Sequence, residues 1–331
     1  MKIHKTTLKE VPKHLAKAKI GNQYAIITDS VTKRLYGNML LGEMKKAGLE
    51  AHLFALPKGE KAKSLQSIQE IAEQMLTKGF DRKDAIITLG GGVVGDAAGF
   101  LASIYMRGIP YVHIPTTLLA MVDSSIGGKT GVNLQSGKNL LGRVEKPQAI
   151  FFDINLLKTL PQKQLRNGMA EVIKAAVIRD AKLFTYLEKN IKKALDGDQK
   201  VLEKIITAAA NIKLNVVEKD LNEKKLRMIL NYGHTYGHVL EKESNYTLLH
   251  GYAISIGMVI ANKLAIKEGF LKEEDALRIR TLLKAAGLPT TTLKVPPLSA
   301  LANDKKCFDG YINFILPTKI GDVKIHKIKC Q

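Results

Sequence analysis

The feature that most constrains the fold is an alternation of short apolar runs with amphipathic helical segments in the first half of the chain. The apolar runs have the length of buried strands and cover residues 24–28, 51–56, 85–89 and 111–114. Apolar residues at helical spacing fill the intervals between them, at about 31–47, 64–79 and 94–105. This rhythm predicts a Rossmann-like α/β fold, with a parallel sheet wound by helices.

The pattern changes near Pro161. Helical periodicity dominates from there to about Gly287, and two strand-like segments at 311–316 and 322–327 form a hairpin-like pair. A chain of 331 residues is long enough for two domains of ordinary size. We therefore expect an α/β domain over residues 1–161 and a mainly α-helical domain over residues 162–331.

The charge of the chain bears on its partners. Lys and Arg number 51 against 31 Asp and Glu, a formal net charge of +20. Because the lysines are scattered singly or in pairs, without an arginine-rich arm, they indicate a solvated surface rather than a nucleic-acid site. An anionic small substrate would profit from the positive field but needs only a few of these charges. No apolar stretch is long enough to span a bilayer, and no signal peptide is recognisable. Cys307 and Cys330 could pair, but nothing requires it, so a reducing compartment is favoured. Together these features predict a cytoplasmic location and no membrane.

A glycine-rich segment, LGGGVVGDAAGF at residues 89–100, directly follows the third apolar run. Glycines at the end of a strand let backbone N–H groups approach a pyrophosphate at the start of the next helix. The segment matches neither a P-loop nor the usual GxGxxG pattern. It indicates a dinucleotide site, with a tight turn under a closely packed helix as the alternative. Asp96 either favours the helix start electrostatically or contacts the ribose or nicotinamide.

The stretch at residues 115–142 is polar and rich in glycine, which is typical of a functional loop. Its lysines and asparagine suit an anion, either phosphate or carboxylate. The candidate residues are Thr116, Thr117, Asp123, Lys129, Lys138 and Asn139.

A candidate metal site follows from His234 and His238, which share one helix face at spacing i,i+4. Thr235 stands where a zincin has glutamate, so a metalloprotease is disfavoured. Glu171 and His250 are further candidate ligands, and spacing alone does not choose between His238 and His250. Glu171 and Lys174, at i,i+3, also fit an ordinary helix ion pair.

Several long motifs, in this order, resemble the 3-dehydroquinate synthase family of sugar-phosphate cyclases. They are GGGVVGDAAGFLASIYMRGI, PTTLLAMVDSSIGGKTGVN, GKNLLG, NGMAEVIKAAVI, LRMILNYGHTYGHVLE and LLHG. The resemblance runs from about Asp29 to Ile320. It implies an N-terminal NAD domain, a helical domain that holds a divalent metal (zinc or cobalt), an active site in the cleft between them, and a homodimer.

The resemblance also implies residue roles. Glu171, His234 and His250 fall on metal ligands, and His238 and Glu223 on positions that transfer protons. Asp123 and Lys174 fall on positions that contact the substrate and are also counted as catalytic. The other substrate positions are Arg107, Lys129, Asn139, Lys213, Arg227, Asn231, Lys305 and Lys306. The NAD positions are Asp29, Lys58, Gly59, Glu60, Lys61, Ala62, Lys63, Gly92, Val93, Val94, Gly95, Asp96, Thr116, Thr117, Lys138, Leu156, Leu157, Lys158 and Thr159.

The implied reaction converts 3-deoxy-D-arabino-heptulosonate 7-phosphate to 3-dehydroquinate and phosphate, with NAD unchanged overall. The chain departs from the family pattern at four places, namely His113, Val144–Lys146, Leu221 and Tyr252. Lys129 and Arg227 are retained and favour a substrate with a carboxylate. The alternatives are another sugar-phosphate cyclase, a metal-dependent polyol dehydrogenase, or a non-catalytic binding protein.

Overall fold

The computed structural model describes residues 2–221, 225–292, 307–308 and 311–329. The chain divides into two compact units, Met1–Leu160 and Pro161–Gln331. None of the described helices is both long enough and apolar enough to cross a membrane.

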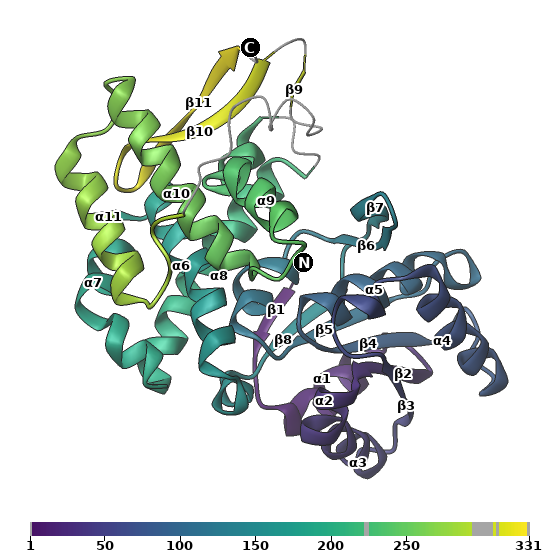
Figure 1. The fold of residues 1–331 in the computed structure, drawn as a ribbon. Coiled ribbons are helices and arrows are strands. Elements are labelled where there is room, and N and C mark those ends of the chain that lie inside the picture. The colour runs from purple at the N-terminus through teal and green to yellow at the C-terminus, as the bar shows by residue number, and fades with distance from the viewer. Residues whose placement is uncertain (1, 222–224, 293–306, 309–310, 330–331) are drawn as a thin grey trace. The chain divides into compact units, whose positions relative to one another are not determined.

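A parallel sheet of six strands forms the centre of the described part of the first unit (Figure 1). The strand order is β1-β8-β5-β4-β2-β3. The bounds are β1 Lys2–Lys5, β2 Gln23–Asp29, β3 Glu50–Leu56, β4 Ala85–Gly90, β5 Tyr111–Pro115 and β8 Ala149–Phe152. The parallel sheet predicted from the alternating pattern is confirmed, and its four predicted strands are β2, β3, β4 and β5.

Helices cover both faces of this sheet. The helices of the first unit are α1 Val11–Ala18, α2 Ser30–Thr32, α3 Asn38–Lys46, α4 Leu65–Thr77 and α5 Gly92–Ile104. Successive residues of a strand point to opposite faces, so Ala25 and Ile27 pack in one core with residues of α4 and α5. Tyr24 and Ile26 pack in the other core, with residues of α1 and α3. Figure 1 shows α5 on one side of the strands and α1 with α2 on the other.

The predicted helix over about 31–47 contains a π-helical turn at Lys33–Gly37, between α2 and α3. The predicted helix after Ser64 is α4, and the Ser64 hydroxyl accepts a hydrogen bond from the Ser67 N–H at 3.2 Å. Strands β1 and β8 have no counterpart in the sequence prediction. β1, with the sequence KIHK, is largely polar and partly exposed, so it contains no apolar run. β8, with the sequence AIFF, is a buried apolar run of four residues that the prediction did not assign.

The stretch at 115–142 is not the long loop that its composition suggested. It contains a π-helical turn at Ala120–Ser124 and an antiparallel hairpin of β6 Lys129–Leu134 and β7 Gly137–Val144. Most of β7 is exposed, so neither of its faces carries the apolar alternation that marks a half-buried strand.

The second unit is mainly helical, as predicted. Its helices are α6 Gln162–Arg179, α7 Ala181–Leu195, α8 Gln199–Lys219, α9 His234–Glu243, α10 His250–Lys267 and α11 Glu273–Ala285. Its strands are β9 Cys307–Phe308, β10 Tyr311–Lys319 and β11 Asp322–Lys329, in the order β11-β10-β9. The predicted hairpin is confirmed as β10 and β11. Asp180 and Asp198 cap α7 and α8 through hydrogen bonds to backbone N–H groups.

Helices α6 and α10 form the centre of this unit, since most of their side chains are buried. A helix that is buried on nearly all sides shows little amphipathic periodicity. These two helices carry Glu171 and His250, so both residues stand on rigid, tightly packed elements.

Candidate metal and nucleotide sites

Three side chains from three helices meet in the second unit. Glu171 of α6, His234 of α9 and His250 of α10 each offer a ligand atom, and these atoms lie within 4.8 Å of one another. Glu171 Oε1 lies 3.4 Å from His250 Nε2 and 3.7 Å from His234 Nε2. Two imidazoles and one carboxylate are a donor set typical of catalytic zinc, so these residues fit a divalent metal.

Close helix packing brings the three residues together. A Cβ on Gly251, next to His250, would lie 2.0 Å from the backbone oxygen of Asn167, one turn before Glu171. A Cβ on Gly257 would lie 1.9 Å from the backbone oxygen of Gly233, next to His234. Only glycine permits these approaches. The two glycines therefore allow α10 to contact both α6 and the start of α9.

Each histidine has a partner for its other ring nitrogen. His234 Nδ1 lies 3.1 Å from the backbone oxygen of Tyr232. His250 Nδ1 lies 3.3 Å from Glu241 Oε2, in the last turn of α9. Such partners fix the tautomer and turn Nε2 of each ring toward a metal. Sequence reasoning did not single out Glu241, although it stands in the quoted motif three residues after His238.

The two carboxylates beside His250 favour a proton on its ring. Burial alone would lower the pKa of His250, but hydrogen bonds to Glu171 and Glu241 and the charges of these carboxylates raise it to about 10. A bound divalent cation would take the place of this proton, so metal binding would release it.

His238 lies beside the three residues. Its ring centroid is 5.2 Å from that of His234 and 6.2 Å from that of His250. His238, Glu241 and His250 form a second group whose ligand atoms lie within 4.8 Å of one another. The structure thus offers two groups of possible metal ligands, which share His250. Glu171 belongs to the group with His234, and His238 belongs to the group with Glu241.

The ion pair that the spacing of Glu171 and Lys174 allows is present, and both side chains are buried. Lys174 therefore places a positive charge beside the carboxylate of the candidate metal centre. This compensates the cost of burying Glu171 away from water.

Arg227 belongs to a short 3₁₀ segment, Leu226–Asn231, that also contains Asn231. The Arg227 side chain is buried, and its Nη1 donates to the Leu221 backbone oxygen at 2.6 Å. Asp220 Oδ2 accepts from the backbone N–H groups of Lys225 and Arg227 at 2.8 and 3.0 Å. These bonds fix the turn that carries the guanidinium. The segment packs against α8, which carries the half-buried Lys213.

Three of the expected site residues, Glu223, Lys305 and Lys306, lie outside the described residues.

The first unit places most of the expected nucleotide residues at one edge of its sheet. Asp29 ends β2, Gly92 follows β4 and Thr116 follows β5, and these three strands are neighbours. The chain runs outward from β2 to β3 and returns to β4 on the other side of β2, so the direction of winding reverses there. Open parallel sheets bind ligands at such a reversal, beyond the carboxyl ends of the strands.

The start of α5 has a feature that fits a ligand. A Cβ on Gly92 would lie 2.9 Å from Ser124 Oγ. This buried hydroxyl oxygen has no hydrogen-bond partner among the described residues. A helix N-terminus with an unpaired hydroxyl beside it fits an anionic group such as the pyrophosphate of NAD.

Asp29 is already engaged locally. Its Oδ1 accepts from the backbone N–H groups of Val31 and Thr32 at 2.8 and 3.0 Å, which caps the helix that follows β2. Its Oδ2 accepts from the Thr32 hydroxyl at 3.0 Å.

Lys63 joins the glycine-rich helix to the β6–β7 hairpin. Its buried Nζ lies 2.6 Å from Asp96 Oδ2 and also contacts Asn139 Oδ1. Burial raises the pKa of Asp96, although the charge of Lys63 opposes the shift. Beside this contact, Lys138 Nζ lies 3.1 Å from Glu60 Oε1. Residues expected at NAD and at the substrate phosphate thus contact one another.

The other expected residues of the first unit lie in several places. Arg107 ends the 3₁₀ turn Tyr105–Arg107 and is exposed, with a φ of 71°. Lys129 begins β6 and is exposed, and Asp123 lies in the π-helical turn. Residues Leu156 to Thr159 belong to the 3₁₀ segment Ile154–Thr159.

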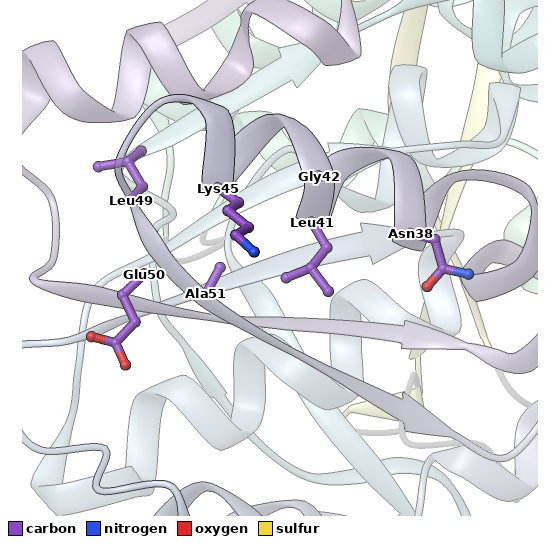
Figure 2. Close-up of a pocket in the computed structure, with 7 residues that line it drawn as sticks. All are labelled: Asn38, Leu41, Gly42, Lys45, Leu49, Glu50 and Ala51. Atoms are coloured by element: carbon purple, nitrogen blue, oxygen red, sulfur yellow. The ribbon is translucent and has the colours of Figure 1, made fainter.

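A surface hollow of about 480 Å³ lies elsewhere, between α3 and the start of β3 (Figure 2). Its lining residues are Asn38, Leu41, Gly42, Lys45, Leu49, Glu50 and Ala51. Because Glu50 and Ala51 begin β3, the hollow is at the amino end of that strand. It contains none of the expected site residues.

Two family profiles and a curated relative match both units of this chain. The profile described as 3-dehydroquinate synthase N-terminal matches residues 53–167, and the one described as 3-dehydroquinate synthase C-terminal matches residues 168–307. The 3-dehydroquinate synthase of Desulforamulus reducens is 42% identical over 325 residues, covering 97% of this chain and 90% of that protein.

Two solved structures of cyclases share the fold. The 2-epi-5-epi-valiolone synthase of Streptomyces hygroscopicus subsp. jinggangensis, with NAD+ and Zn2+ bound, is 32% identical with a TM-score of 0.89. The match covers 98% of this chain and 91% of that one. A 2-deoxy-scyllo-inosose synthase, complexed with carbaglucose-6-phosphate, NAD+ and Co2+, is 27% identical with a TM-score of 0.88, covering 99% and 93%. By its sequence motifs, its fold and these matches over nearly its whole length, this chain belongs to the 3-dehydroquinate synthase family.

Proposed function

We propose that this chain is an NAD- and metal-dependent lyase that converts 3-deoxy-D-arabino-heptulosonate 7-phosphate to 3-dehydroquinate and phosphate. The observation that carries the proposal is the meeting of Glu171, His234 and His250 in a member of this family. The first unit is the NAD-binding domain and the second is the metal- and substrate-binding domain. The reaction proceeds by oxidation, phosphate elimination, reduction and an internal aldol step.

The cofactors supply the chemistry that side chains lack. A divalent metal held by Glu171, His234 and His250 would polarise a substrate hydroxyl, and bound NAD would take up a hydride and return it. Gly92, Asp96 and Thr116 at the carboxyl edge of the sheet, with Ser124 beside them, support NAD binding by the first unit.

The remaining residues bind, orient and move protons. Lys129 and Arg227 bind the substrate carboxylate, and the bond to the Leu221 carbonyl orients the guanidinium for this task. Arg107 and Asn139, with Lys305 or Lys306, bind the phosphate. His238, which is not in the donor set that contains Glu171, transfers protons near neutral pH. Glu223 is proposed as a second proton acceptor.

A related cyclase acting on a sugar phosphate without a carboxylate is the second candidate. It is favoured by the two cyclase structures that this chain resembles, one of which holds carbaglucose-6-phosphate. Lys129 and Arg227 support the carboxylate-bearing substrate instead, since a buried guanidinium is well suited to a planar carboxylate. The homodimer and the cytoplasmic location expected from the sequence stay predictions.

Phosphate release from the heptulosonate 7-phosphate tests the proposal, with NAD at a small fraction of the substrate concentration and Zn2+ added. We expect many turnovers per NAD, no accumulation of NADH absorbance, and loss of activity with EDTA. Stoichiometric NADH would indicate a dehydrogenase instead. Phosphate release only from sugar phosphates without a carboxylate would favour the second candidate.

A further inference from the structure

We propose that Glu241 is a positioning residue of the metal centre, whose carboxylate holds the His250 ring with Nδ1 protonated and Nε2 turned toward Glu171. The inference rests on the proposed function only for the assignment of the metal to Glu171, His234 and His250.

The carboxylates of Glu171 and Glu241 lie beside the two different nitrogens of the His250 ring. His250 Nε2 lies 3.4 Å from Glu171 Oε1, and His250 Nδ1 lies 3.3 Å from Glu241 Oε2. A neutral imidazole has one N–H and one lone pair. If Glu241 accepts the Nδ1–H, the Nε2 lone pair is the one available to a metal beside Glu171.

The position of Glu241 suits this task. Its side chain is 12% exposed, so the hydrogen bond is largely shielded from water. His234, His238 and Glu241 stand at i, i+4 and i+7 of α9 and therefore share one helix face. The same helix thus contributes a metal ligand and the carboxylate that orients a ligand of α10.

His234 is held differently. Its Nδ1 contacts the backbone oxygen of Tyr232, which no substitution removes. The partner of His250 is a side chain, so its contribution can be measured directly by mutation. A carboxylate partner also makes the imidazole a stronger donor to a metal than a carbonyl partner does.

A second reading of the same geometry makes Glu241 a ligand of another ion, with His238 and His250. His250 would then have to bind two ions through both ring nitrogens, which requires the loss of both ring protons. Because neutral imidazole holds its remaining N–H well above physiological pH, Glu241 as hydrogen-bond acceptor is favoured.

Zinc affinity, measured by competition with a chromogenic chelator in the absence of NAD and substrate, tests the proposal. The variants are Glu241→Ala, Glu241→Gln and, as a matched control, Glu243→Gln, which changes the same charge at an exposed position of α9. We expect roughly 10–100-fold weaker zinc binding for E241A. E241Q, whose amide oxygen can still accept from Nδ1–H, should lose less than about tenfold. E243Q should bind zinc like the wild type.

Two further readouts separate positioning from general destabilisation. The absorption spectrum of the Co2+-loaded protein should change in E241A, because the coordination of His250 relaxes. The melting temperature of metal-free E241A should fall by no more than a few degrees, because one hydrogen-bond acceptor of His250 is lost, and E241Q should restore most of this loss.

Three results would overturn the proposal. One is zinc binding by E241A within twofold of a tightly binding wild type. Another is a wild type that binds two zinc ions per chain while E241A loses only the second. The third is a large fall in metal-free stability that E241Q fails to restore. A wild type that binds no zinc at all would instead contradict the proposed function.

Discussion

The backbone N–H of Gly251 donates a 2.7 Å hydrogen bond to Oδ1 of Asn167, a residue 84 positions earlier in the chain. Asn167 stands one turn before Glu171 on α6, and Gly251 directly follows His250 on α10. This bond therefore sets the position of one expected metal ligand relative to another.

Loss of this contact should weaken both stability and metal binding. Asn167→Ala leaves the buried Gly251 N–H without its acceptor. We therefore expect the free energy of unfolding to fall by about 1–3 kcal/mol and the zinc affinity to fall as well. Gly251→Ala should be at least as damaging, because its Cβ would meet the Asn167 oxygen at 2.0 Å. Urea unfolding and zinc titration measure the two effects. Gly42→Ala, whose Cβ would have open space on α3, is the control and should not lower stability.

Crowding the start of α5 should weaken NAD binding alone. The Cβ of Gly92→Ala would lie 2.9 Å from Ser124 Oγ and 3.3 Å from Ser124 Cβ. We expect NAD affinity, measured by calorimetry, to fall roughly tenfold as the backbone is pushed out of place. Zinc binding by the second unit should not change. Adding Ser124→Gly removes both contacts but also the hydroxyl beside the start of α5, so the double variant is compared with Ser124→Gly alone. NAD affinity of the double variant far below that of Ser124→Gly would argue against steric crowding as the cause.

Arg227 should be needed for turnover and not for NAD binding. Arg227→Lys loses the planar pair of donors and the bond to Leu221, so we expect kcat/KM to fall roughly 100-fold or more. Phosphate release and NAD titration provide the two readouts. Arg278→Lys is the control, since Arg278 forms a partly exposed pair with Glu188 and should leave turnover unchanged. A parallel loss of NAD affinity in the Arg227 variant would contradict the assigned role.

His113 should make stability depend on pH. The ring is buried on β5, with Nδ1 2.5 Å from the Thr88 hydroxyl and its edge against Tyr111, and burial lowers its pKa to about 4. An unfolded histidine titrates near 6.5. The folded state therefore resists a proton that the unfolded state accepts, and stability falls as pH drops from about 6.5 to about 4.

The loss attributable to His113 should reach about 3 kcal/mol at the acid end of this range. His113→Gln has no such titration. Between pH 6.5 and pH 4, the free energy of unfolding of this variant in urea should therefore fall by about 3 kcal/mol less than that of the wild type. Identical pH profiles for the two proteins would show that His113 is not responsible.

Local pattern was sufficient for most of the fold. The strands β2, β3, β4 and β5 contain apolar runs, the helices between them have apolar residues at helical spacing, and the β10–β11 hairpin has two strand-like segments. It failed for β1, which is short and largely polar, and for β7, which is largely exposed. It also missed β8, although its residues form a short apolar run. Burial creates the apolar pattern on which the prediction depends, so partly exposed strands such as β1 and β7 leave little signal.

The sequence by itself determined the residue types of both sites, the glycine-rich turn after β4 and the family motifs that contain them. Only the tertiary structure decided which groups meet, such as Glu171 with His234 and His250, His250 with Glu241, and Lys63 with Asn139. The reason is physical. Helical and strand periods act over a few residues, whereas these contacts join segments brought together by close packing of glycines and by the winding of the chain.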